Sequence, residues 1–222
     1  MNHLPIYIPI VFILTALLTL FIFFKATRKS AATINLIIVW LAIQAAIAYT
    51  GYYTQTQTLP PRFLFLVLPP LLLIILLFMT WRGRRFIDGL DMRMLVLIHI
   101  VRIPIEFVLY WLSKENVVPT IMTFEGRNFD IFAGVTAPIV YYLRFIRPVI
   151  GKYALLTWNF ICIALLLNVV VHGILSVATP FQQFAFDQPN VAVLYFPYVW
   201  LPCLIVPVVL FCHLAAIRQT LK

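Results

Sequence analysis

The chain has 222 residues, of which 64% are hydrophobic and only 10% are charged, and its mean hydropathy is +1.02. About a quarter of the residues in a soluble globular domain are charged, so this composition excludes an ordinary soluble domain. The formal net charge of +9 is divided among several short segments, which is unlike the single basic patch that binds nucleic acid. We therefore expect the lipid bilayer as a partner, and no nucleic acid.

Seven apolar blocks approach the roughly 20 residues that a transmembrane helix needs. The first block is followed, not preceded, by positive charge, which favours an uncleaved span over a secretion signal. We predict an all-α polytopic membrane helix bundle of about seven transmembrane helices, with residues 1–222 forming a single integral-membrane domain. The blocks cover residues 4–24, 31–53, 63–81, 92–112, 129–146, 153–176 and 191–217.

Lysine and arginine alternate between the two sides of these blocks, and cytoplasmic loops retain basic residues. Twelve of the 16 basic residues fall on one side, which predicts an external amino terminus, a cytoplasmic carboxyl terminus and a location in a bacterial inner (cytoplasmic) membrane. The twelve are Lys25, Arg28, Lys29, Arg82, Arg84, Arg85, Arg93, Arg144, Arg147, Lys152, Arg218 and Lys222.

The fourth block contains His99, Arg102, Glu106 and Tyr110. At about 100° per residue, these four side chains fall within an arc of roughly 80° on one helix face. Ionisable groups at membrane depth are costly and normally face a protein interior or a wet cavity. This stripe is therefore our first candidate for a ligand-binding site.

Polar residues on the predicted outer side extend the candidate site. His172 lies near the outer end of the sixth block, and Glu125, Arg127 and Asp130 lie at the mouth of the fifth. If all of these residues line one outward-opening cavity, an anionic or zwitterionic solute would meet the mouth first and Arg102 last. Two structural alternatives are that Asp130 stabilises the start of the fifth helix and that Arg127 pairs with a neighbouring acid.

Arg102 and Glu106 are one helical turn apart and can form an ion pair. The function we favour is transporter-like, the handling of a small polar solute or ion. One alternative is an intramembrane enzyme that acts on a lipid, with Glu106 and His172 as acid–base groups. Another is a structural or sensory subunit in which the stripe is a closed polar lock.

Familiar cofactor sites lack their residues. The seventh block has no lysine for a retinal Schiff base, and the four histidines are too widely spaced for a local metal motif, so we expect no metal site. A bis-histidine haem would need His99 and His213 at similar depth. We leave the cofactor and the enzymatic activity open. Cys162, Cys203 and Cys212 lie within predicted helices and suit apolar packing.

The charge pattern gives a testable topology. Single cysteines introduced at Lys25, Arg84 and Lys152 should react with a membrane-impermeant thiol reagent from the cytoplasmic side only, and those at Glu125 and Asp187 from the outside only. External labelling at position 84 would overturn the orientation.

Overall fold

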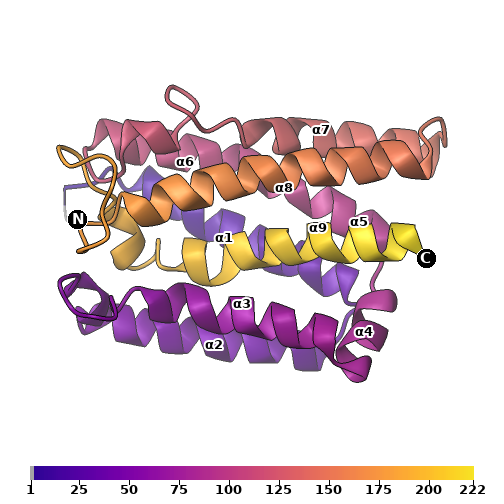
Figure 1. The fold of residues 1–222 in the computed structure, drawn as a ribbon, viewed down its shortest axis with the longest axis horizontal. Coiled ribbons are helices and arrows are strands. Elements are labelled where there is room, and N and C mark those ends of the chain that lie inside the picture. The colour runs from indigo at the N-terminus through magenta and orange to yellow at the C-terminus, as the bar shows by residue number, and fades with distance from the viewer. Residues whose placement is uncertain (1–2) are drawn as a thin grey trace.

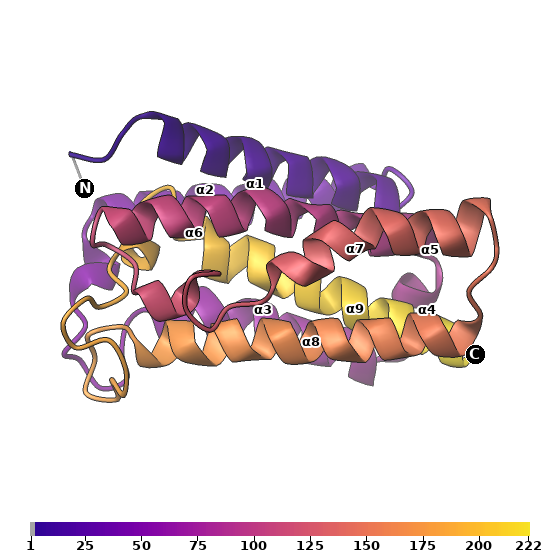
Figure 2. The same ribbon diagram turned by 90° about the horizontal axis from the view of Figure 1, so that it is seen from above.

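The computed structural model describes residues 3–222, and the regular structure in this range is helical throughout. Figures 1 and 2 show long helices lying side by side along one axis, with the start of α1 and the end of α9 at opposite ends. The all-α prediction is confirmed. The helices are α1 (Tyr7–Ala26), α2 (Ala31–Tyr49), α3 (Leu64–Met79), α4 (Trp81–Asp88), α5 (Met92–Leu97), α6 (Arg102–Lys114), α7 (Ile131–Tyr141), α8 (Lys152–Leu175) and α9 (Val206–Leu221).

Within residues 3–222, five helices are long and apolar enough to cross a membrane. They are α1, α2, the continuous helix Met92–Lys114, α8, and the helix Leu201–Leu221 that includes α9. A sixth is added if α3 and α4, which are bent by 92°, count as one span, and the helix Ile131–Ile146 is shorter. Seven spans and the orientation of the termini therefore stay predictions.

Proline interrupts the last helix, and a neighbouring helix compensates. Pro207 has no N–H, so the carbonyl of Cys203 one turn earlier loses its helical partner. The indole Nε1 of Trp40 in α2 donates to that carbonyl over 3.1 Å, and Nε1 of Trp200 donates to the carbonyl of Leu41 over 3.2 Å. Such satisfaction by neighbours is what makes proline tolerable inside a membrane helix.

The helix that carries the polar stripe is also irregular. Between α5 and α6 the backbone tightens into a 3₁₀ segment, Ile98–Val101, and the N–H of Arg102 reaches the carbonyl of His99 three residues back. Pro104 follows and cannot donate to the carbonyl of Ile100. His99 therefore lies within the tightened segment, and Arg102 directly follows it.

A close approach of α7 to α6 positions the polar residues between them. A Cβ atom added at Gly134 would lie 2.8 Å from Cγ1 of Ile103 and 3.3 Å from Cβ of Arg102. Ala137, one turn further along α7, is fully buried. Gly134 and Ala137 therefore face the bundle, and small residues of this kind let membrane helices pack closely.

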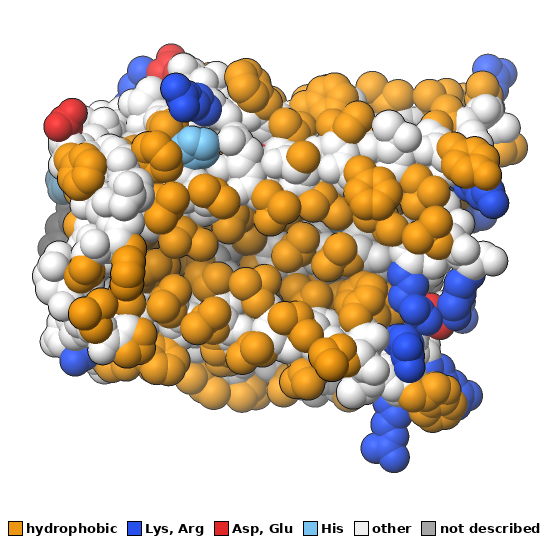
Figure 3. Space-filling model, in the orientation of Figure 1, with side chains coloured by type: hydrophobic (Ala, Val, Ile, Leu, Met, Phe, Trp, Pro, Cys, Tyr) orange, Lys and Arg blue, Asp and Glu red, His pale blue; other side chains and the backbone are white. Residues whose placement is uncertain are grey.

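One end of the bundle is basic, as Figure 3 shows. There the chain bends so sharply between α3 and α4 that a Cβ at Gly83 would lie 2.3 Å from the carbonyl oxygen of Leu77. Hydrogen bonds from Arg218 and Lys222 near the end of α9 hold the pKa of Asp88 down at about 2. The carboxylate therefore stays ionised and paired through the physiological pH range.

The α6–α7 contact predicts a destabilising effect of a single methyl group. Gly134→Ala gains about 0.8–1 kcal/mol of helix propensity, but overpacking against Ile103 and Arg102 costs about 1–3 kcal/mol. We expect a net loss of stability in denaturation measurements on the detergent-solubilised protein. Gly151→Ala is the matched control, because a Cβ there meets nothing within 4 Å. Equal stability of the two variants would contradict the close approach.

Candidate functional site

The guanidinium of Arg102 is the central buried charge of the bundle. The residue is 3% exposed, and its Nη1 lies 2.7 Å from Oδ1 of Asp130 and 3.5 Å from the carbonyl oxygen of Cys162. The sequence suggested Glu106 as the ionic partner, and that expectation is wrong. The close packing of α7 brings Asp130 to the guanidinium, while Glu106 is bound to a different side chain.

A run of hydrogen bonds extends from the arginine of this ion pair through His213 to Asn159. Asn159 Nδ2 donates to the carbonyl of Leu155, so its Oδ1 must be the atom that accepts from Nδ1 of His213, 2.8 Å away. Nε2 of His213 lies 3.1 Å from Nη2 of Arg102. Arginine only donates, so Nε2 accepts and His213 is neutral with its proton on Nδ1. Arg102 therefore donates on both sides, to Asp130 and to His213, and the run on the histidine side ends at the carbonyl of Leu155.

His99 stacks on His213. The two ring centroids are 3.7 Å apart with planes 10° from parallel, and the edge of Trp158 packs against both rings. His99 and His213, the two histidines that a bis-histidine haem would need, do lie together, but face-to-face rings at this distance leave no room for a haem between them. Across residues 3–222, neither ring nitrogen of His99 has a hydrogen-bond partner. No group of three or more potential metal ligands occurs in that range either.

Glu106 lies one turn along α6 from Arg102 and is 2% exposed. Its Oε1 accepts a hydrogen bond of 2.6 Å from Nδ2 of Asn128, which also donates to the carbonyl of Met122. Oδ1 of Asn128 accepts from the backbone N–H of Asp130. The other carboxylate oxygen of Glu106, Oε2, is buried without a partner in the described chain, and an unsatisfied buried acceptor is costly.

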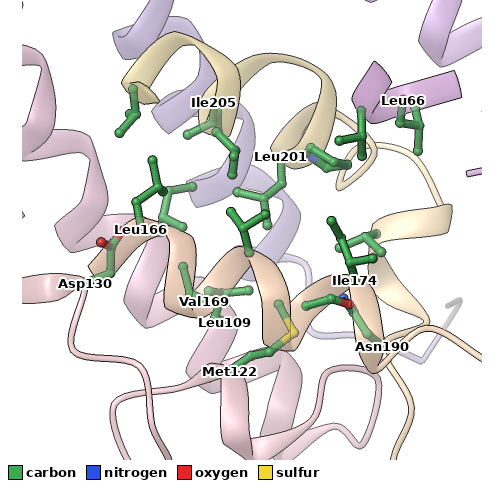
Figure 4. Close-up of a pocket in the computed structure, with 18 of the residues that line it drawn as sticks. Leu66, Leu109, Met122, Asp130, Leu166, Val169, Ile174, Asn190, Leu201 and Ile205 are labelled. Carbon is green, nitrogen blue, oxygen red and sulfur yellow. The ribbon is translucent and has the colours of Figure 1, made fainter. Parts of the chain in front are cut away.

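A pocket reaches this unpaired carboxylate. It lies between α3, α6, α8 and the start of the last helix, has a volume of about 100 Å³, and is lined mostly by leucine, isoleucine and valine. Arg102, Glu106 and Asp130 line it, and Figure 4 shows Asp130 and Asn190 at opposite ends with apolar side chains between them. Asn190 Nδ2 donates to the carbonyl of Gly173, which leaves Oδ1 as a second buried acceptor without a partner among residues 3–222.

The remaining predicted site residues lie elsewhere. Tyr110 is half-buried and stacks on Phe124, and His172 is half-buried with Nδ1 close to the carbonyl of Asn168. Glu125 pairs with Lys114 over 2.8 Å, so Glu125 is not the acid that we expected beside Arg127.

Arg127 itself is exposed, and its carbonyl accepts from Asn168. None of Tyr110, His172, Glu125, Arg127 and His99 lines the pocket, so the polar gradient expected from the external mouth down to Arg102 does not follow it.

Two residues that complete the site were not among the predicted ones. Asn128 bridges Glu106 to the start of α7, and Asn159 orients His213. The helical arithmetic does place Asn159 on the opposite face of its helix from Asn168 and His172. The signal available in the sequence was an asparagine within an apolar helix, because a polar group in lipid-like surroundings needs a partner.

These features define an all-helical protein with helices apolar enough for a membrane and a buried polar cluster at the floor of an apolar pocket. The chain belongs to the family described as "Domain of unknown function (DUF8737)", whose model matches residues 59–221. The match runs from just before α3 through α9 and includes every residue of the polar cluster. No curated protein matches the chain. No solved structure matches it either.

The ion pair predicts strong coupling between Arg102 and Asp130. Removing one partner strands a buried charge and costs about 3–5 kcal/mol, whereas removing both costs less than the sum of the two single changes. Thermal melts of Arg102→Leu, Asp130→Leu and the double variant in detergent measure this difference. The exposed pair Lys114–Glu125 is the matched control and should give nearly additive effects. Additivity at Arg102 and Asp130 would contradict the pairing.

Proposed function

We propose that the protein is a transporter-like membrane protein that binds a proton or a small organic cation at Glu106. The observation that carries the proposal is the unpaired Oε2 of this buried carboxylate in a residue that lines a pocket. The predicted seven spans, external amino terminus and bacterial inner-membrane location form part of the proposal.

The charges of the site favour a cation over the anionic or zwitterionic solute that we expected from the sequence. Arg102 is already paired with Asp130 at 2.7 Å, and its neighbour His213 is neutral. If Glu106 is ionised, the three groups carry one excess negative charge. A proton on Oε2 or a donor group of a ligand balances that charge, and the exchange of one for the other would couple ligand movement to proton movement.

The pocket also limits the ligand. Its volume of about 100 Å³ is small, and its walls are mostly aliphatic. Glu106 Oε2 and Asn190 Oδ1 are both acceptors without partners in the described chain. A small molecule with hydrogen-bond donors and a short apolar body, such as a primary alkylammonium ion, matches this lining.

An intramembrane enzyme acting on a lipid is the second candidate, and the apolar walls of the pocket favour it. Against it, His172, the proposed acid–base partner of Glu106, does not line the pocket. The structural-lock alternative accounts well for Asp130, Arg102, His213 and Asn159, which bond to one another. It does not account for the free oxygen of Glu106.

Liposomes that contain the purified protein and a trapped pH-sensitive dye test the proposal. An imposed gradient of n-butylammonium or of protons should drive proton exchange in the native protein. Glu106→Gln keeps the shape of the side chain but removes its charge, and should abolish the exchange while the protein remains folded.

Glu125→Gln is the control for this experiment, because Glu125 is an exposed carboxylate outside the pocket, and it should retain the exchange. Undiminished exchange in folded Glu106→Gln, or none with either probe in the native protein, would overturn the proposal. If the native protein changes the lipid composition of the vesicles and Glu106→Gln does not, the result would favour the intramembrane enzyme.

A further inference from the structure

A second cavity, separate from the one at Glu106, lies between α2, α3 and α9. It has a volume of about 270 Å³ and, apart from Thr33, its lining side chains carry no hydroxyl, amide or charge, with the indole of Trp40 already bonded to Cys203. On α3 it extends from Pro69 to Leu77. At about 1.5 Å per residue this is roughly 12 Å, close to the roughly 15 Å of one leaflet of the hydrocarbon core. The groove therefore has the length and chemistry of a site for a lipid acyl chain.

The groove ends at α4, on the basic end of the bundle. Phe86 of α4 lines it, and Arg82 lies one helical turn before Phe86 on the same side of the helix. The ring of Phe211, which also lines the groove, packs against the rings of Phe86, Phe78 and Phe23.

The arginines of α4 are free to bind an anion. Arg82, Arg84 and Arg85 are exposed, and within residues 3–222 none of them forms an ion pair. The acid of the same helix, Asp88, is already bound by Arg218 and Lys222. The sharp bend of 92° between α3 and α4 turns this basic helix across the end of the groove.

We propose that this groove binds one anionic phospholipid, with an acyl chain between α2 and α3 and the phosphate on the arginines of α4. Guanidinium groups bind phosphate oxygens through paired hydrogen bonds. Basic residues beside a span also attract anionic headgroups. A neutral lipid or a second copy of the chain could fill the apolar groove but would leave the three arginines without a counter-charge.

Native mass spectrometry of the detergent-solubilised protein tests the proposal. The protein is mixed with equal amounts of dioleoyl phosphatidylglycerol and dioleoyl phosphatidylcholine. We expect one phosphatidylglycerol to be retained in preference to phosphatidylcholine. The double variant Arg82→Gln/Arg85→Gln should weaken retention of phosphatidylglycerol about thirtyfold, because each basic residue near the headgroup contributes roughly 1 kcal/mol and 1.4 kcal/mol is tenfold.

The control double variant, Arg147→Gln/Lys152→Gln, removes the same charge from the same end of the bundle, beyond the groove, and should retain the preference. Leu73→Trp fills the groove from α3 and Ile37→Trp fills it from α2, and either should displace the lipid. Leu72→Trp, on the neighbouring position outside the groove, should not. Equal retention of the two lipids, an unchanged preference in Arg82→Gln/Arg85→Gln, or retention in both filled variants would overturn the proposal.

Discussion

A positive charge buried in an apolar bundle imposes the main constraint on this structure. Arg102 cannot lose its proton, so its charge must be balanced where it lies. Asp130 supplies the balance over 2.7 Å, and it can do so only because Gly134 lets α7 approach the start of α6. The position of α7, the loop before it and the depth of the pocket floor all depend on this pairing, since breaking it would leave two charges without partners in a medium of low dielectric constant.

The hydrogen bonds around Arg102 divide the cluster into two parts. On one side, the hydrogen bonds form a run in which Arg102 donates both to Asp130 and to His213, and His213 donates in turn to Asn159. Such a run is rigid because reversing any one bond would bring two donors or two acceptors together. On the other side, Glu106 is held by Asn128 through a single oxygen. Rigid support beside one unsatisfied group is the arrangement expected of a binding site built on a structural core.

The sequence predicted the coarse structure well because composition and periodicity report burial directly. Apolar length located the long helices, although the last one begins at Leu201 and not at residue 191. The stripe of His99, Arg102 and Glu106 does face the interior, where all three are at most 3% exposed. The choice of ionic partner could not be predicted in this way. Arg102 has Glu106 one turn away on its own helix, but its actual partner, Asp130, is set by the distance between α6 and α7. That distance depends on the packing around Gly134. The spacing of residues along one helix cannot reveal it.

Of the outer polar residues, Asp130 joins Arg102 in the pocket lining, and the others do not, for a related reason. We joined Glu125, Arg127 and His172 to the stripe because all of them fall on the predicted outer side. A shared predicted side does not make side chains face the same cavity. Glu125 pairs with Lys114, and His172 turns to its own helix backbone. The apolar walls of the pocket come from α3, α8 and the last helix, and ordinary leucines and valines give no sign in the sequence that they border an empty space.

The indole of Trp40 connects α2, which lies before the family match, to the last helix, which lies within it. The family match begins at residue 59, after α2, yet Pro207 within the matched region leaves a carbonyl that Trp40 satisfies from outside it. In this chain, the carbonyl that the proline leaves without a helical partner is satisfied by a donor from another segment. Within the family, we expect Pro207 and Trp40 to be gained and lost together. A relative without α2 should carry a residue with a backbone N–H in place of Pro207.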